Sequence, residues 1–393
     1  MKKRSHFLIT IIVCCSSMFS LIAQQRYGLA KVKITYDSVR SNALGQVRRI
    51  SIYKPEVFPE YAEAVSPIIY VLDGEFYTDY IATMINLMCE RFVTMPPITV
   101  VGIENIGGSM GRNRDMTPLV AKDSSSFKTS GGAENFIKFI REELFPFVEK
   151  DHKKTPYRVI VGHSLAGLLV MHSFLKHPGM FNAWLASDPS MWMDQNAYMH
   201  IALEAINKMR AHDGSLFMST VNNPSLVTNA RKVDSLLKSR GPKGLSYQFI
   251  EYPREDHLTV CFKSFYEGFR FFFQMDPPEY GKQPAEITYD LFEKHYEGLS
   301  KIYGYKMKPP ESKINSYGYR FLNQLNDVDK ALEFFKKNVE NYPNSANVYD
   351  SYGEAFLKKG DKKNAMLNYE KAFQMDPTNT AARDIVNKLK SEQ

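Results

Sequence analysis

The stretch RVIVGHSLAG, residues 158–167, decides how the rest of the chain is interpreted. An apolar run leads into Gly-His-Ser, and small residues then open a second apolar run. This order is typical of a β-strand, a sharp turn and a helix, which together expose a serine hydroxyl beyond the carboxyl edge of a parallel sheet. Small residues are needed around the serine because the turn is tight and the helix packs closely against the strand. We therefore take Ser164 as a candidate nucleophile.

The composition is that of a globular protein. The chain has 393 residues, 44% of them hydrophobic, which is enough for roughly two to three domains at about 150 residues each. The formal net charge is +7, and basic residues alternate with acidic ones along the chain. No basic run is interleaved with aromatic residues, so the sequence does not indicate nucleic-acid binding.

The N-terminal residues differ from the rest of the chain. The basic residues 2–4 precede an apolar run, and a small residue, Ala23, ends it. This pattern predicts a signal peptide over residues 1–23, export to the periplasm or the extracellular space, and no stable membrane anchor after cleavage. Neither Cys14 nor Cys15 follows Gly, Ala or Ser, so we expect no lipoprotein anchor.

Beyond that segment the chain has two cysteines, Cys89 and Cys261. Two cysteines do not make a disulfide framework. Whether they pair stays open at this point.

The middle of the chain predicts a largely parallel sheet. Alternating apolar residues over 29–38 and 46–53 indicate an antiparallel strand pair. Helical segments then alternate with strands, which favours helices on both faces of a parallel sheet. The expected strands that follow the pair are 68–72, 98–103, 157–161, 182–187, 215–221 and 245–252. Residues 107–132, rich in Gly, Ser, Arg and Asp, are expected to form a long loop.

Polar residues that could take part in chemistry fall at the ends of these strands. They are Glu75, Ser164, Asp188, Asn223 and His257. Ligand sites in such sheets lie beyond the carboxyl ends of the strands.

A serine hydroxyl needs an adjacent base. His257 lies in the loop between the last strand and the helix that follows it, whereas most other histidines fall in or beside predicted helices. His163 is adjacent to Ser164, and the turn is expected to point the two side chains apart. We predict His257 as the base.

Two backbone N–H groups are expected to form an oxyanion hole. One is Leu165, directly after the nucleophile, and the other is Glu75, after the strand 68–72.

The acid that would orient the base is not identified by the sequence. The loop after Val221 is expected to carry it, but it contains Asn223 and no carboxylate. Asp234 falls in a predicted helix, and Asp256 would have to fold back on its neighbour His257. Asn223, Asp234, Asp256 or no third group at all therefore remain as alternatives.

The C-terminal part predicts a helical repeat. Pro343 and Pro377 lie 34 residues apart, which is the period of tetratricopeptide repeats. The positions ahead of Pro377 match the aromatic and small residues of that pattern: Tyr349, Gly353, Phe356, Ala365, Tyr369 and Ala372. Because isolated arrays need about three units, we expect the module to pack on a connector helix, predicted at roughly 287–302, or on the preceding domain.

These motifs together resemble the esterase family of α/β-hydrolases that includes esterase D, enterobactin-type siderophore esterases, feruloyl esterases and mycolyltransferases. The resemblance spans roughly residues 29–274. It rests on the motifs at 71–74, 102–105, 114–118, 162–167 and 188–192 together with His257. It implies an α/β-hydrolase fold, Ser164 as nucleophile, His257 as base, and the N–H groups of Glu75 and Leu165 as the oxyanion hole. The chain departs from Gly-x-Ser-x-Gly at Ala166.

The predicted organisation is a signal peptide (1–23), an α/β-hydrolase domain (24–275), a connector (276–311) and tetratricopeptide-like repeats (312–393). We expect an exported serine esterase acting on siderophore, feruloyl or short-acyl esters, with no metal and no cofactor. Arg112 and Arg114 are candidates to meet an anionic or catecholate substrate, and the alternative is that Arg114 and Asp115 pair structurally. The repeats are expected to bind a protein or peptide partner. Two alternatives remain: a scaffold with weak or no catalysis, and an acyltransferase.

Overall fold

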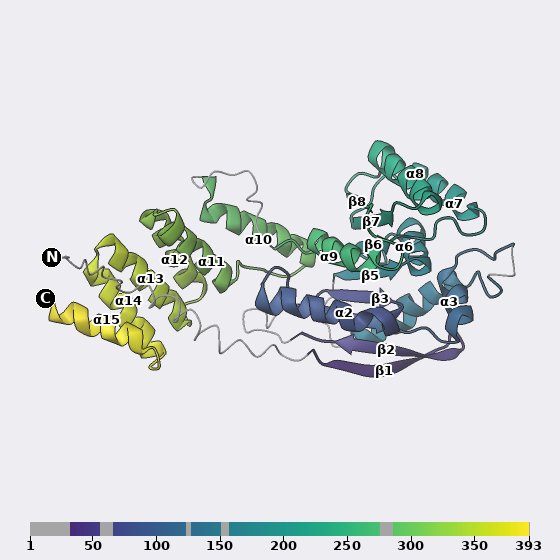
Figure 1. Ribbon diagram of the computed structural model, residues 1–393. Coiled ribbons are helices and arrows are strands. Elements are labelled where there is room, and N and C mark those ends of the chain that lie inside the picture. The colour runs from purple at the N-terminus through teal and green to yellow at the C-terminus, as the bar shows by residue number, and fades with distance from the viewer. Residues whose placement is uncertain (1–31, 56–65, 123–126, 151–156, 276–285, 393) are drawn as a thin grey trace, which may run out of the picture. The chain divides into compact units, whose positions relative to one another are not determined.

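The computed structural model describes residues 32–55, 66–122, 127–150, 157–275 and 286–392 (Figure 1). The predicted signal peptide lies outside these residues and stays a prediction. No helix within the described ranges is both long enough and apolar enough to cross a membrane.

The centre of the hydrolase part is an eight-stranded sheet in the order β1-β2-β4-β3-β5-β6-β7-β8. Strands β1 and β2 are antiparallel to each other, and β2 is antiparallel to β4, while every later pair is parallel. The strands are β1 (Ile34–Ser41), β2 (Gln46–Tyr53), β3 (Ile68–Leu72), β4 (Thr99–Ile103), β5 (Arg158–His163), β6 (Ala183–Ser187), β7 (Ser215–Val221) and β8 (Ser246–Tyr252). The predicted fold class, a mostly parallel α/β sheet with a helical C-terminal part, is confirmed.

Helices connect these strands and cover the sheet. They are α2 (Gly74–Asn86), α3 (Gly108–Met116), α4 (Ala133–Phe139), α5 (Phe145–Val148), α6 (Leu165–Lys176), α7 (Ala197–Lys208), α8 (Pro224–Arg240) and α9 (Val260–Phe272), with π-helical turns η2 (Leu87–Arg91) and η3 (Ile140–Leu144).

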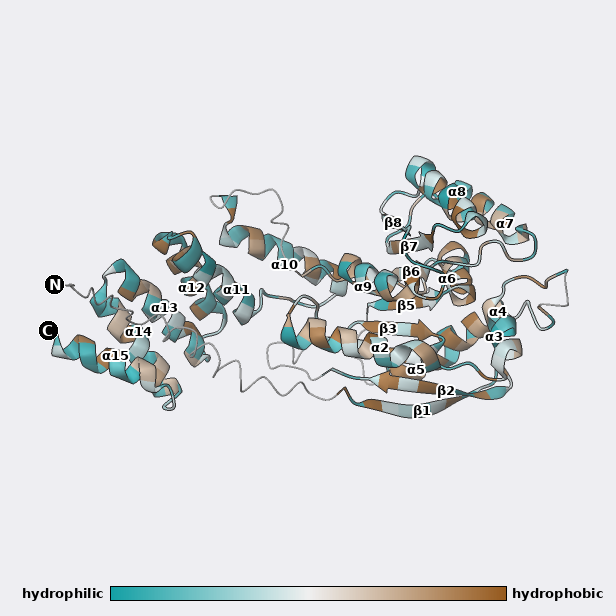
Figure 2. Cartoon of the chain, viewed as in Figure 1, coloured by the Kyte–Doolittle hydropathy of each residue, from teal (hydrophilic) through white to brown (hydrophobic). Residues whose placement is uncertain are grey.

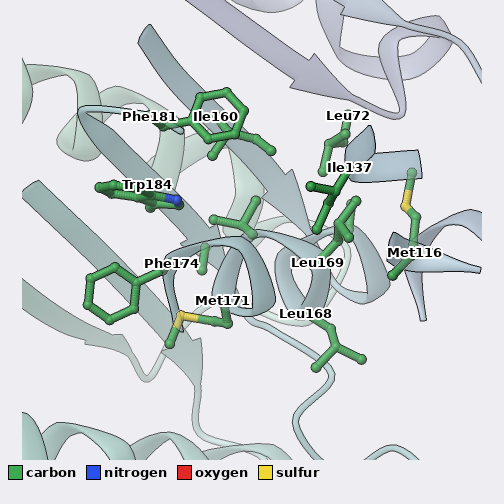
Figure 3. Packing of buried hydrophobic residues seen from close by; sticks show 14 of the residues in the cluster. Leu72, Met116, Ile137, Ile160, Leu168, Leu169, Met171, Phe174, Phe181 and Trp184 are labelled. Carbon is green, nitrogen blue, oxygen red and sulfur yellow. The ribbon is translucent and has the colours of Figure 1, made fainter. Parts of the chain in front are cut away.

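Alternation along each strand divides the helices between two faces. On one face, Ile68 and Tyr70 of β3 share a hydrophobic core with α4, α6, α7 and α8. Figure 3 shows Leu169 and Phe174 of α6 gathered with Trp184 of β6 in this core. On the other face, a Cβ added to Gly268 of α9 would come within 2.5 Å of Leu185. Helix α6 is therefore held in the core, which fixes the turn at its N-terminus.

One expectation about the chain between β4 and β5 is wrong. The first part of the predicted loop 107–132 forms helix α3. This helix has no apolar period because charge pairs hold it: Asp115 lies 2.5 Å from Arg48, and both side chains are almost fully buried. A buried ion pair of this kind leaves no hydrophobic pattern in the sequence.

The C-terminal part consists of antiparallel helices. They are α10 (Tyr289–Tyr303), α11 (Glu311–Tyr319), the π-helical turn η5 (Arg320–Gln324), α12 (Val328–Asn341), α13 (Ala346–Lys359), α14 (Lys362–Met375) and α15 (Thr380–Ser391). Figure 2 shows that these helices mix hydrophilic and hydrophobic residues, as expected of a repeat that buries one face of each helix. A Cβ at Gly353 would lie 3.1 Å from the Tyr369 ring, so a small residue is needed where α13 and α14 cross.

The connector helix α10 contacts elements on both sides. Near its start, the ring of Phe292 lies 5.4 Å from that of Phe334 in α12. At its end, the ring of Tyr303 lies 5.2 Å from that of Tyr157, just before β5. The expected packing of the repeats on the connector is therefore present.

The two cysteines of the described chain are both free and buried. The Cys89 thiol donates a hydrogen bond to the carbonyl of Pro96, at 2.7 Å. The question of pairing, open from the sequence, is answered: Cys89 and Cys261 do not form a disulfide.

Candidate active site

The turn between β5 and α6 is strained at Ser164. Its backbone has φ 60° and ψ −117°, a region that non-glycine residues rarely adopt. The neighbours allow this turn because they are small: a Cβ at Gly162 would lie 2.5 Å from the carbonyl oxygen of Ala166, and one at Gly167 would lie 3.0 Å from that of Ser187. Ala166 itself fits, so the departure at this position leaves the turn intact. The strain projects the Ser164 hydroxyl from the sheet edge.

The Ser164 hydroxyl lies at one end of a chain of three side chains. Its Oγ is 2.9 Å from Nε2 of His257. Nδ1 of the same imidazole is 2.5 Å from Oδ2 of Asp188. Serine, imidazole and carboxylate are thus connected in the order that lets an imidazole take a proton from a hydroxyl while the carboxylate holds it in position. The Oγ of Ser190 is also near, 3.3 Å from the Ser164 Oγ.

Asp188 is held rigidly at the end of β6. It is completely buried, and its backbone has a positive φ of 43°. Its other oxygen, Oδ1, accepts hydrogen bonds from the Thr220 hydroxyl at 2.8 Å and the Val221 N–H at 3.3 Å. These donors come from the end of the neighbouring strand β7. One carboxylate oxygen is thereby anchored, and the other is directed at His257.

None of the three residues that the sequence offers as the third group contacts His257 in this way. Asn223 caps α8 by accepting from the Ser225 N–H. Asp234 accepts from Lys238 and from Tyr247. Asp256 accepts from the N–H groups of the two residues that follow His257, Leu258 and Thr259.

The group beside the imidazole is Asp188, which follows β6 and precedes β7. The sequence predicts Asp188 at a strand end but does not connect it with the base, because the acid is expected one strand later. The sequence signal that could have identified Asp188 is its position directly after β6, the strand that pairs with β5.

The backbone donors expected for an oxyanion hole lie in the first turns of two helices. Leu165 is the first residue of α6, and Glu75 is the second residue of α2. The first N–H groups of a helix have no acceptor within that helix. Strands β3 and β5 are parallel neighbours, with Val71 paired to Val161, so both helices begin at the same edge of the sheet. The placement fits the expectation, and the role stays a prediction.

Side-chain contacts tie the start of α2 to the Ser164 turn. Arg112 pairs with Asp73 through two hydrogen bonds, 2.7 and 2.8 Å long, and its Nη2 donates to the carbonyl of His163 at 3.4 Å. Asn105 donates to both Asp73 and Glu75. Arg112 is thus engaged in holding the site together.

Arg114, the other arginine considered for substrate contact, pairs with Asp115 at 2.7 Å. The structure therefore shows the second of the two roles considered for Arg114, the pairing with Asp115.

His163 lies behind the base as a neutral group. Burial lowers the pKa of His163 to about 4, and the nearby His257 adds to the lowering. The two rings lie 4.7 Å apart, and His163 Nδ1 lies 3.1 Å from the Tyr77 hydroxyl. At neutral pH His163 is therefore neutral and adds no positive charge of its own beside the His257 ring. That the His163 and Ser164 side chains point apart stays a prediction, and the His163 ring packs beside that of His257.

Exposed apolar side chains lie within one or two sequence positions of residues of the site. Phe76 follows Glu75 and is 72% exposed, and Leu258 follows His257 and is 75% exposed. Trp192, two residues after Ser190, is 40% exposed, and its ring contacts that of Phe127. Large exposed apolar residues near a reactive group are typical of a surface that binds an apolar or aromatic ligand.

The sheet order, the strained serine turn at the end of β5 and the histidine after β8 define an α/β-hydrolase. The family described as "Putative esterase" matches residues 41–227, and a tetratricopeptide repeat matches residues 346–379.

Proteins similar to this chain include an esterase and a serine hydrolase. The ferri-bacillibactin esterase BesA of Bacillus subtilis is 26% identical over 249 residues, which cover 58% of this chain and 86% of that protein. The crystal structure of an IroE-like serine hydrolase from Shewanella oneidensis is 26% identical, with a TM-score of 0.63, and the match covers 78% of this chain and 99% of that one.

An uncharacterised protein from Capnocytophaga ochracea shares the fold over 91% of this chain and 100% of its own, with 20% identity and a TM-score of 0.62. This chain is a carboxylic-ester hydrolase with a C-terminal tetratricopeptide module, and siderophore esterases are among its relatives.

Proposed function

We propose that the protein is an exported serine esterase that cleaves siderophore-type esters through an acyl-enzyme formed on Ser164. The observation that carries the proposal is the continuous contact from Ser164 through His257 to Asp188. The export follows from the pattern of residues 1–23 alone.

In the proposed mechanism His257 acts first as base and then as acid. Its Nε2 takes the proton of Ser164 as Oγ attacks the ester carbonyl, and it gives that proton to the departing alcohol. Asp188 keeps the proton-bearing Nδ1 in place, so Nε2 is free to accept. The N–H groups of Leu165 and Glu75 are the proposed donors to the negative oxygen of the tetrahedral intermediate. Water then repeats the sequence to release the acid and regenerate Ser164.

The substrate class is inferred from the relatives and from the exposed apolar residues. BesA is an esterase of a ferric siderophore, and a siderophore triacetylfusarinine C esterase of Aspergillus fumigatus is 29% identical over 157 residues. Phe76 and Trp192 would offer aromatic surface to such a ligand. Feruloyl and short-acyl esters are the competing classes.

The scaffold alternative was motivated by the lack of an acid behind the base. Because Asp188 occupies that position, no observation now favours a scaffold over an enzyme. An acyltransferase would use the same three residues, and its product would depend on an added alcohol.

The test compares Ser164→Ala with an exposed control, Ser239→Ala, on siderophore, feruloyl and p-nitrophenyl esters. We expect Ser164→Ala to lose at least about 10³-fold in kcat and to lose labelling by a fluorophosphonate, while Ser239→Ala stays at the level of the unaltered protein. Turnover retained in a folded Ser164→Ala protein would disprove the mechanism. A kcat/KM highest on feruloyl or short-acyl esters would disprove the substrate class alone.

A further inference from the structure

A second cluster of reactive side chains lies at the opposite end of α6 from Ser164. Glu134 comes from the first turn of α4, His172 from the C-terminal half of α6, and His177 from the position directly after α6. One ligand atom from each of the three lies within 4.8 Å of the others. At about 1.5 Å of rise per residue, His172 lies roughly 12 Å along the helix from Ser164. The cluster is therefore separate from the esterase site.

Both imidazoles present the same nitrogen to one carboxylate. His172 Nε2 lies 2.7 Å from Glu134 Oε1, and His177 Nε2 lies 3.1 Å from Glu134 Oε2. Two histidines and one carboxylate are a ligand set that Zn²⁺ and related transition ions use, with a water in the fourth position.

The second nitrogen of His172 is oriented by a buried tyrosine. His172 Nδ1 lies 3.0 Å from the hydroxyl of Tyr198, a fully buried residue of α7. Histidine ligands commonly use the nitrogen that does not bind the metal for such a hydrogen bond, which fixes the ring. With Nδ1–H donating to Tyr198, Nε2 is left unprotonated and directed at the shared space.

The spacing between the carboxylate and each imidazole requires only a small adjustment, and the ligand atoms of all three residues already lie within 4.8 Å of one another. Ligands about 2.0–2.1 Å from a tetrahedral ion are separated from each other by roughly 3.3 Å. The observed separations of 2.7 and 3.1 Å are shorter, so the carboxylate must withdraw by about half an ångström. The Glu134 side chain is 60% exposed and that of His172 is 7% exposed. His172 is thus fixed in the protein interior, whereas Glu134, the ligand that must move, is largely exposed to solvent.

We propose that Glu134, His172 and His177 bind a divalent transition-metal ion of the Zn²⁺ class, with a fourth position open to water. This differs from the expectation of no metal drawn from the sequence. In the sequence, His172 and His177 lie 38 and 43 positions after Glu134 and form no metal-binding motif with it. The ion would join the start of α4 to the end of α6 and serve structure, without a part in ester cleavage.

The experiment is a titration of the tag-free, chelator-treated protein with Zn²⁺ and, separately, Mg²⁺ by calorimetry. The variants are Glu134→Gln and His177→Gln, which keep side-chain size and polarity and leave the buried His172 in place. His200→Gln, at an exposed histidine of α7 outside the cluster, is the matched control. Thermal unfolding and esterase activity are measured on the same samples.

We expect one equivalent of Zn²⁺ to bind, at least tenfold weaker affinity in each cluster variant, unchanged affinity in the control, and no saturable binding of Mg²⁺. Bound Zn²⁺ should raise the Tm by about 2–5 °C, and ester hydrolysis should be unchanged in all three variants. No saturable Zn²⁺ binding, or affinity that both cluster variants retain, would overturn the proposal and leave the cluster as a hydrogen-bonded link between two helices.

Discussion

At the scale of single residues, the site depends on which atom of His257 carries the proton. The carboxylate of Asp188 accepts from Nδ1, so Nε2 faces Ser164 without a proton. The anchoring of Asp188 Oδ1 by Thr220 and Val221 leaves no freedom to rotate the carboxyl group. These contacts favour the His257 tautomer that the proposed mechanism needs.

Asp188→Asn tests this arrangement. The amide oxygen would keep the bonds to Thr220 and Val221, which places the NH₂ group against His257 Nδ1. The imidazole must then carry its proton on Nε2 and cannot accept one from Ser164, so we expect kcat to fall by about 10³–10⁴-fold with the fold intact.

Matched changes at the carboxylates considered from the sequence, Asp234→Asn and Asp256→Asn, should alter kcat by less than about threefold. Steady-state kinetics on a p-nitrophenyl ester distinguish the three variants. A large loss in Asp256→Asn together with a small one in Asp188→Asn would show that the acid has been wrongly assigned.

At the scale of elements, Tyr303 is one of the side chains that attach α10 to the hydrolase part, together with His295, whose Nε2 lies 3.1 Å from the carbonyl of Gln274. Tyr303 is 3% exposed, stacks on Phe273 and contacts the ring of Tyr157. Its hydroxyl donates to the carbonyl of Phe272 at 3.0 Å. Tyr303 therefore contributes to stability mainly through its buried ring surface, and it adds one hydrogen bond.

Removing the ring should cost much more than removing the hydroxyl. We expect Tyr303→Ala to lower the free energy of unfolding by about 3–5 kcal/mol, because it leaves a cavity among aromatic rings. Tyr303→Phe should cost about 1 kcal/mol, since only the hydrogen bond is lost. Urea denaturation followed by tryptophan fluorescence measures both, because Trp184 lies in the hydrolase core. Equal small losses would show that α10 contributes little to the stability of this part.

At the scale of the whole molecule, local features were the ones that the sequence predicted. The strand, turn and helix around Ser164 follow from neighbouring residues, and so do the parallel strands and the repeat spacing before Pro377. Helix α3 was missed because the buried pair Arg48–Asp115 stabilises it in place of an apolar stripe.

The contact of His257 with Asp188 was also missed. These two residues are 69 positions apart, and several polar groups end at the same edge of the sheet. Only the arrangement of the strands in space decides which of these groups meet.

Export also belongs to the whole molecule. If residues 1–23 direct it, the processed protein should be found outside the cytoplasm with Gln24 as its first residue. N-terminal sequencing of the protein from cell fractions measures this. A chain that keeps Met1 in the cytoplasmic fraction would contradict export.

The positions of the three site residues along the chain have a consequence for folding. Ser164 and His257 are 93 residues apart, and Asp188 and His257 are 69 apart, so 24 residues separate Ser164 from Asp188. The turns that hold those two are joined by backbone bonds: Ser164 N–H donates to Ser187, and Ser190 N–H donates to Ser164, each at 3.0 Å.

One strand–helix–strand unit thus brings serine and carboxylate together over a short loop, which closes quickly. His257 is positioned only after β7 and β8 have been added. The contact between Ser164 and His257 is therefore completed only with the last strand of the sheet, so a partly folded form that lacks β8 also lacks this contact.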